Sequence, residues 1–320
     1  LPGLMEDRES VYYSIGLNPA FDKHVLKCMN DLRAQSRRGA RVPYEFVSLE
    51  YLLHDMRLYK SREEISLMRK AAKISVQAHI NAMQVCKSGM YEYELEAEFL
   101  CAFKRNGADW AYSSIVGGGE NGCILHYTEN NEVLNEKELV LIDAGAEYQG
   151  YAADITRTFP VNGKFTAAQK EIYEVVLKAQ EAAFAKVKPG NHWNDPHDAA
   201  VKELTRGMVD IGLLKGRPAQ LIKDNSYMKY YMHRTGHWLG MDVHDVGDYK
   251  VDDKWRLLEP GMVLTVEPGL YIPSGSRGAR RWWSIGVRIE DDLAVTKDGY
   301  ELLTKGLPRT VDEIEAVMSS

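Results

Sequence analysis

The sequence predicts an α+β fold built on a mostly antiparallel sheet, and two patterns lead to this prediction. Helical periodicities and short β-type runs come in blocks, in the order helix, helix, strands, helix, helix, strands. This order differs from the regular strand–helix alternation of parallel sheets. Two apolar runs, at residues 139–145 and 262–269, each follow a two-helix block and end in an acid with glycine two positions later. This weak internal repeat favours two similar halves.

Composition narrows the class of protein. The 320 residues are 45% hydrophobic and 27% charged, which is ordinary for a globular protein. A net charge of −6 argues against a nucleic-acid partner or an anionic membrane surface, and no apolar run approaches the ~18 residues of a membrane span. The four cysteines lack CxxC spacing and no signal peptide opens the chain, so we expect reduced thiols and a cytoplasmic location.

The chain is expected to contain two parts of unequal size. Residues 1–56 are interpreted as the C-terminal remnant of an N-terminal domain plus a linker, with a helix over residues 22–33 and a short strand over residues 44–49. Such a short segment buries little core alone. Because the first residue is Leu1, we expect a fragment or a processed product. Residues 57–320 are expected to form the main domain.

Start and stop signals define the helices of the main domain. Ser61 to Glu64 is a capping box, and the helix that follows should end before Gly89. A second helix should begin near Glu92 and stop at Gly107, which suits the left-handed position after a helix.

The later helices have similar signals. Thr166 opens a capping box for a helix that we expect to reach residues 189–190. Asp195 is expected to be the N-cap of the next helix, because Pro196 suits the first helical position. Residues between that helix and 305 are interpreted as strands and turns, and Thr310 caps a last helix.

The run at 139–145 and the strand after it predict a hairpin with two acids. If the chain turns about the peptide between Tyr148 and Gln149, Asp143 and Asp154 lie directly opposite, with Cβ atoms ~5 Å apart. Two like charges so placed repel, and a divalent cation bridging them would remove the repulsion. The alternative is two acids beside a solvent-facing turn.

Further candidate ligands lie in three later segments. Three of the nine histidines, His233, His237 and His244, fall within twelve positions. An isolated histidine is often a core residue, but three together favour metal ligands and proton carriers. Glu267 ends an apolar strand, and strict alternation places Arg288 and Glu290 on one face of another.

Counting candidate ligands indicates the metal class. Two Asp, two Glu and one His give hard, oxygen-rich coordination, and their four negative charges balance two divalent ions. The absence of cysteine from this set disfavours structural zinc, so Mn²⁺, Co²⁺ or catalytic Zn²⁺ fit best. Two such ions ~3.5–4 Å apart can deprotonate a bridging water, which is hydrolase chemistry.

In their order and local context, these five residues resemble the ligands of the dinuclear metallopeptidases with the pita-bread fold: Asp143, Asp154, His237, Glu267 and Glu290. Within that group, residues 115–130, 139–160 and 233–245 look like those of the bacterial Xaa-Pro aminopeptidases. The resemblance covers about residues 57–318. It implies a curved, mostly antiparallel sheet with two pseudo-symmetric halves, preceded by a remnant of an N-terminal domain.

The resemblance also implies a reaction and residue roles. A hydroxide bridging two Mn²⁺ ions would hydrolyse the N-terminal Xaa-Pro bond, with Asp154 and Glu290 bridging the ions and Glu267 accepting the hydroxide's proton. Peptides with proline in second position would be the substrates, and a homo-oligomer, dimer or tetramer, is expected for the full-length protein. The remaining implied residues are His244 and His126 as donors to the scissile carbonyl and oxyanion, and His233, Tyr271 and Arg288 as the proline pocket wall.

Two departures and several alternatives accompany this interpretation. Arg234 stands where many relatives have glycine, and residues 277–283 form an altered basic loop that we expect to be a surface loop, not a nucleic-acid patch. The nearest alternative function is a prolidase restricted to dipeptides. A methionine aminopeptidase, a non-catalytic pita-bread binding module and a metal-free creatinase-type hydrolase are less well supported, the last two because all five ligands are present.

Overall fold

The computed structural model describes residues 1–277 and 280–320, and it divides the chain into two compact units, Leu1–Arg57 and Leu58–Ser320. In the smaller unit, β1 (Ser10–Tyr12) and β2 (Glu45–Val47) pair in parallel beside α2 (Pro19–Ala34). The remaining elements of this region are α1 (Pro2–Met5), η1 (Ser36–Arg38) and α3 (Leu49–Leu58).

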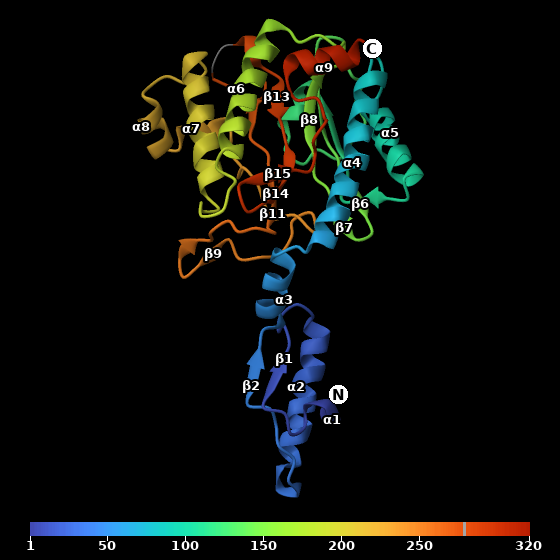
Figure 1. The fold of residues 1–320 in the computed structure, drawn as a ribbon, viewed down its shortest axis with the longest axis vertical. Helices are drawn as coiled ribbons and strands as arrows, with labels where there is room; N and C mark the ends of the chain where they lie inside the picture. Colours follow the sequence, from blue (N-terminus) through green and yellow to red (C-terminus); the bar gives the residue numbers. More distant parts are fainter. Residues whose placement is uncertain (278–279) are drawn as a thin grey trace. The chain divides into compact units, whose positions relative to one another are not determined.

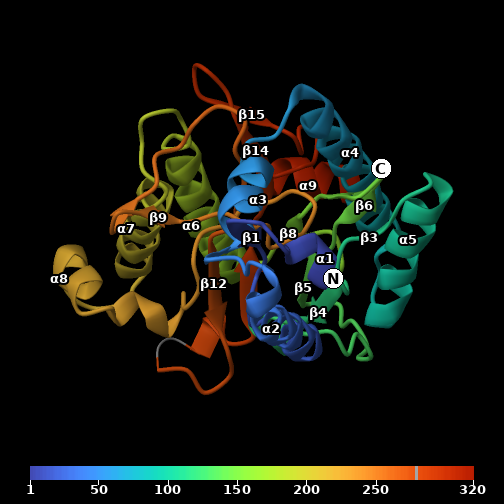
Figure 2. The same cartoon turned by 90° about the horizontal axis from the view of Figure 1, so that it is seen from below.

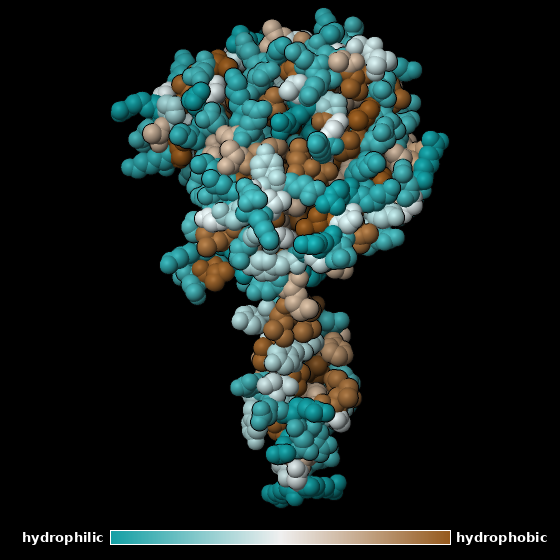
Figure 3. Space-filling model, viewed as in Figure 1, coloured by the Kyte–Doolittle hydropathy of each residue, from teal (hydrophilic) through white to brown (hydrophobic). Residues whose placement is uncertain are grey.

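The smaller unit has a small core and many exposed apolar side chains. Helix α2 begins where the Asn18 side chain accepts a hydrogen bond from the Phe21 amide, and it buries Cys28 and Met29. Large side chains nearby are left in solvent, including Leu17 at 72% exposure and Tyr44 at 83%. Figure 3 shows hydrophobic surface on this unit beside hydrophilic side chains.

The helices of the larger unit begin where the sequence signals predict. Capping boxes at Ser61, Thr166 and Thr310 are all present, and the Thr166 side chain accepts from the Gln169 amide. The long helices of this unit and its last helix are α4 (Arg62–Val85), α5 (Glu92–Arg105), α6 (Ala167–Phe184), α7 (Asp195–Asp210) and α9 (Val311–Met318).

Two helix boundaries and one segment differ from the prediction. Helix α6 ends at Phe184, before the predicted residues 189–190. The chain already turns at residues 185–186, so Pro189 lies beyond the end of the helix. Asn194, not Asp195, is the N-cap of α7, so Pro196 occupies the second helical position. Proline is tolerated there because the backbone N–H that it lacks would have no partner within the helix. The segment expected to contain only strands and turns also holds α8 (Pro218–Lys223) and η3 (Ser226–Lys229).

The strands of the larger unit pair only in antiparallel fashion among the described residues, and they lie between two pairs of helices. Figures 1 and 2 show α4 and α5 on one side of the strands and α6 and α7 on the other. The first-half strands are β3 (Asp109–Trp110), β4 (Ile115–Gly118), β5 (Leu139–Asp143), β6 (Ala146–Tyr148), β7 (Tyr151–Ala152) and β8 (Thr156–Pro160).

The second half repeats this arrangement, with a helix pair followed by antiparallel strands. Its strands are ordered β11-β14-β15 in one group and β12-β13 in another, and β9 and β10 form a separate hairpin. Their bounds are β9 (Lys250–Val251), β10 (Lys254–Trp255), β11 (Val263–Val266), β12 (Gly269–Ile272), β13 (Ile285–Arg288), β14 (Asp291–Val295) and β15 (Tyr300–Leu302).

One hydrophobic core runs through both halves of the larger unit and surrounds the inner strands. It includes Phe99 and Phe103 on α5, Ile172 on α6 and Leu264 on β11, all almost completely buried. Within the residues that the structure describes, no helix has both the length and the apolar character that crossing a bilayer requires.

The predicted surface loop at residues 277–283 is described only in part, because residues 278 and 279 lie outside the described residues. Arg280–Trp282 form the short helix η4. Trp282 is buried and donates its indole N–H to Glu171, which also pairs with Arg281 at 2.8 Å. This end of the loop is therefore anchored to α6.

Candidate metal centre

Asp143 and Asp154 do not lie directly opposite one another, so that prediction is wrong. The turn lies at Gln149 and Gly150, whose φ values of 51° and 81° suit a two-residue hairpin turn with left-handed backbone at both positions. Asp143 consequently pairs with Thr156 in the ladder between β5 and β8. The predicted partner of Asp143 lies two positions from the observed one. Because side chains alternate between the two faces of a sheet, a shift by an even number leaves the face unchanged, and both carboxylates still reach the same site.

A tyrosine hydroxyl connects the two aspartates. The Tyr112 hydroxyl lies 2.6 Å from Asp143 Oδ1 and 2.5 Å from Asp154 Oδ1. Burial and the neighbouring carboxylates raise the pKa of Tyr112 well above its usual value, so the group remains a donor at neutral pH. No pattern in the sequence indicated Tyr112, because it lies in an irregular segment between β3 and β4.

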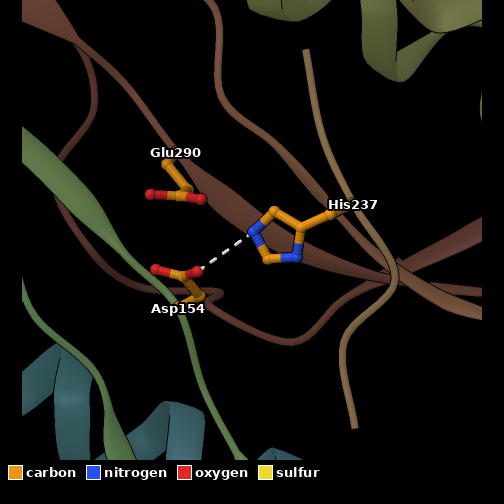
Figure 4. A group of neighbouring side chains, drawn as sticks. All are labelled: Asp154, His237 and Glu290. Atoms are coloured by element: carbon orange, nitrogen blue, oxygen red, sulfur yellow. Dashed lines mark ion pairs between the residues drawn. The ribbon is translucent and has the colours of Figure 1, made fainter. Parts of the chain in front are cut away.

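The second half contributes a histidine and two glutamates. Ligand atoms of Asp154, His237 and Glu290 all lie within 4.8 Å of one another, and Figure 4 shows the three side chains converging. His237 Nε2 is 3.3 Å from Asp154 Oδ2 and 3.6 Å from Glu267 Oε1. The structure thus brings ligand-type groups from both halves to one point.

Backbone packing fixes the direction of His237. Its Nδ1 lies 2.9 Å from the Trp238 carbonyl and donates to it, so Nε2 is the ring nitrogen that faces the acids. Gly236 allows this segment to approach β11, since a Cβ at that position would lie 2.1 Å from the Thr265 carbonyl oxygen. Gly236 therefore serves a close approach between two backbone segments.

Arg288 joins the acids to the expected substrate pocket. Its Nη2 lies 2.6 Å from Asp143 Oδ2, and its Nη1 donates to the Tyr271 hydroxyl at 3.1 Å. The same hydroxyl is 2.9 Å from His233 Nε2. The three residues predicted for the pocket wall are consequently linked by one chain of hydrogen bonds.

Thr156 is a further residue that sequence reasoning missed. Its hydroxyl donates to Glu290 Oε2 at 2.6 Å and accepts from Arg288 Nε at 3.0 Å. It orients a glutamate of the second half from a strand of the first. Only the register of β5 and β8 could have revealed it, because Thr156 is the residue paired with Asp143.

The acids raise one another's proton affinity. Burial, together with neighbouring carboxylates, raises the pKa of Asp143 to about 6 and of Glu267 to about 7, and the pKa of Glu290 well above its usual value. Burial is the largest influence on Asp154 and acts to raise its pKa, but the hydrogen bonds from His237 and Tyr112 and the charges of His237 and Arg288 together lower it.

The neighbouring carboxylates also raise the pKa of His237. Burial acts to lower its pKa, yet the hydrogen bond to Asp154 and the charge of Glu267 raise it to about 9. Four carboxylates and one imidazole therefore form a cluster that attracts cations. The donor set fits two divalent ions of the hard or borderline kind, because oxygen ligands predominate and four negative charges are available.

His126 and His244, the other predicted donors, line the same cavity as the acids. The His244 ring lies edge-on to the His237 ring, with 4.3 Å between centroids, and burial lowers its pKa. His126 is exposed and comes from the segment after β4. Both histidines thus face the space in front of the cluster.

The cavity has a volume of about 480 Å³, and several aromatic side chains line it. Trp193, Tyr249 and Trp255 line it, and Trp193 packs on Tyr249 with 4.7 Å between ring centroids. Arg234 lines the cavity as well. The sequence offered no signal for the aromatic residues, which come from the loop before α7 and from the region of the β9–β10 hairpin.

A buried ion pair lies behind the cluster. Arg157 donates to Asp291 Oδ1 at 2.7 Å, and both side chains are 1% exposed. The Arg157 guanidinium also donates to the carbonyls of Thr156 and Glu290, at 2.9 and 2.7 Å. Gln180 on α6 completes the shell of Asp291 at 2.9 Å. This pair ties the two strand segments that carry Thr156 and Glu290 to each other.

Comparisons with known proteins give a consistent result. A model of metallopeptidase family M24 matches residues 66–297. The Xaa-Pro aminopeptidase of Escherichia coli strain K12 is 46% identical over 316 residues, which are 98% of this chain and 71% of that protein. The structure of Pseudomonas aeruginosa aminopeptidase PepP matches with a TM-score of 0.97 and 55% identity, over 99% of this chain and 72% of that one.

A second structural relative is zinc-substituted E. coli aminopeptidase P in complex with product. It matches with a TM-score of 0.96 and 46% identity, and the alignment covers 99% of this chain and 72% of that one.

Proposed function

The chain belongs to metallopeptidase family M24, and we propose that it is a metal-dependent aminopeptidase. It would hydrolyse the bond between the N-terminal residue of a peptide and a proline in second position. The observation that carries the proposal is the convergence of five ligand-type side chains from both halves in one cavity. The relatives that support it are named Xaa-Pro aminopeptidase and aminopeptidase P.

The proposed ligands of two divalent cations are the five residues of the cluster: Asp143, Asp154, His237, Glu267 and Glu290. Bound there, the ions would supply Lewis acidity and lower the pKa of a water molecule. We propose Mn²⁺ as the physiological ion, since oxygen donors predominate, with Co²⁺ and Zn²⁺ as alternatives. One ion, with Asp143 nearby, would hold the free α-amine of a peptide, which would account for cleavage at the N-terminal residue only.

Proton transfer is assigned to this chain's own side chains. Glu267 lines the cavity beside His237, and we propose that it accepts a proton from the attacking water and passes it on. His244 and His126 would donate hydrogen bonds to the scissile carbonyl as negative charge develops on its oxygen.

Selection of proline is assigned to the wall formed by His233, Tyr271 and Arg288. Their mutual hydrogen bonds fix the wall, with 2.9 Å between His233 Nε2 and the Tyr271 hydroxyl. The imide nitrogen of a bound proline has no N–H, so the ring's shape must distinguish it from other residues. A rigid wall suits recognition by shape.

We also propose self-association and a cytoplasmic location. The apolar side chains exposed on Leu1–Arg57, such as Leu17 and Tyr44, favour contact with protein, and a second copy of the chain is the partner we propose. All four cysteines are free thiols, in keeping with a reducing compartment. Light scattering after size-exclusion chromatography tests the oligomer.

The decisive experiment compares Xaa-Pro-Yaa tripeptides with Xaa-Pro dipeptides and Xaa-Ala-Yaa tripeptides, with Mn²⁺ and after chelation. The proposal expects cleavage of the Xaa-Pro tripeptide alone, lost on chelation and restored by metal. Cleavage confined to dipeptides would identify a prolidase instead. If no peptide is cleaved by protein shown to contain two metal ions per chain, the proposed activity is wrong.

A further inference from the structure

The outer part of the cavity carries positive charge. Arg234 lines the cavity, and its guanidinium carbon lies 5.1 Å from the ring centroid of Trp255. Lys250 approaches the same ring, with Nζ at 4.6 Å from the centroid. Arg234 donates to the neutral side chain of Asn194. Within the described residues, no carboxylate forms an ion pair with Arg234 or Lys250.

The two cations are held in place without being neutralised. A guanidinium or ammonium over an aromatic face is attracted by the ring and stays available to an anion at its edge. Arg234 is exposed, so its outer N–H groups face solvent at the cavity mouth. A planar fork of donors of this kind matches the two oxygens of a carboxylate.

The cavity therefore offers two separate binding features. One is the cluster, whose ions would hold an α-amine, and the other is the exposed Arg234, one residue along the chain from His233 of the proposed proline wall. A short peptide has the complementary pattern, with an α-amine at one end and a carboxylate at the other. An extended chain advances about 3.3–3.6 Å per residue, so three residues span about 10 Å.

We propose that Arg234, supported by Trp255 and Lys250, recognises a carboxylate carried by the residue that follows proline. In a tripeptide this group is the C-terminal carboxylate. The site thereby favours short peptides with a free C-terminus over the same peptides with that charge removed. This inference rests on the proposed aminopeptidase function and adds the substrate class to it.

The test compares a tripeptide acid with its amide. Hydrolysis of Gly-Pro-Leu and of Gly-Pro-Leu-amide is measured with Mn²⁺-loaded enzyme at low salt. We expect kcat/KM for the acid to exceed that for the amide about fivefold, the upper part of the range for a partly exposed ion pair. The ratio should shrink as salt is added, because the pair is screened. A ratio of one at low salt overturns the proposal.

Substitutions at Arg234 test whether this residue causes the preference for the acid over the amide. In Arg234→Met the acid-to-amide ratio should fall towards one, and in Arg234→Glu it should drop below one, because the carboxylate is then repelled. Arg217→Gln, at an exposed position before α8, is the matched control and should keep the wild-type ratio. An unchanged ratio in both Arg234 variants would refute the proposal.

Failure of this inference is distinguishable from failure of the proposed function. Equal cleavage of acid and amide leaves the aminopeptidase activity established and removes only the role of Arg234. Absence of cleavage of either peptide by metal-loaded wild-type enzyme refutes the activity itself, and with it the inference.

Discussion

Replacing Tyr112 with phenylalanine removes one oxygen atom from between two proposed metal ligands. That oxygen lies 2.6 Å from Asp143 Oδ1 and 2.5 Å from Asp154 Oδ1. A hydroxyl carries a single proton, so it donates to one carboxylate at a time and stands between the two negative charges. Without it, both side chains lose a group that fixes their orientation.

The size of the effect follows from the kind of bond that is lost. A hydrogen bond to a charged group contributes about 1.5–3 kcal/mol. If that free energy holds the aspartates in their ligating orientation, its loss weakens metal binding by about 10- to 100-fold, which is typical for residues that orient metal ligands. We expect a smaller effect on KM, because Tyr112 does not line the cavity.

Calorimetric titration of the metal-free protein with Mn²⁺ measures this effect directly. Tyr148→Phe is the matched control, because it removes the same atom nearby and the Tyr148 hydroxyl makes no hydrogen bond within the described residues. The reasoning would be refuted if Tyr112→Phe bound Mn²⁺ within twofold of the wild-type protein. Equal weakening in both variants would likewise contradict a specific role for Tyr112.

Three other outcomes can be measured by unfolding experiments. Arg157→Met leaves Asp291 as a buried charge without its partner, so urea unfolding should show a loss of about 3–5 kcal/mol, and a loss below 1 kcal/mol would contradict this. Burial lowers the pKa of His79 to about 3 from 6.5, so the unfolded state binds the extra proton and stability falls as pH drops below 6.5, by about 1.4 kcal/mol per unit. His79→Gln should have a shallower pH dependence, and an equal slope would contradict the assignment. Chelation should lower the melting temperature, because ions at 100 times their dissociation constant add about 2.7 kcal/mol per site, and an unchanged temperature would exclude tight binding.

Local signals in the sequence predicted the helices well and led to the candidate ligands, because both depend on neighbouring residues. The capping box at Ser61 and the stop at Gly107 act within one helical turn, and the structure contains both. An acid at the end of an apolar strand is also a local pattern, which is why Glu267 and Glu290 could be selected.

The contacts that the sequence did not predict depend on register and on loops. The hairpin turn includes Gln149, whose backbone is left-handed. Glutamine is uncommon in this conformation, so its residue type did not indicate the turn. An error of one position in the turn shifted the partner of Asp143 by two and hid its pairing with Thr156. Tyr112 and Trp255 reach the site from segments without periodicity, so no pattern could select them.

The division of the proposed ligands between two halves has a consequence for how the protein would mature. Asp143 and Asp154 come from the first half, whereas His237, Glu267 and Glu290 come from the second, so neither half alone offers the full set. During synthesis the ions have no complete site until the second half has folded against the first. Metal binding would then be a late step of folding. The concentration of free ions would determine how far binding stabilises the folded chain.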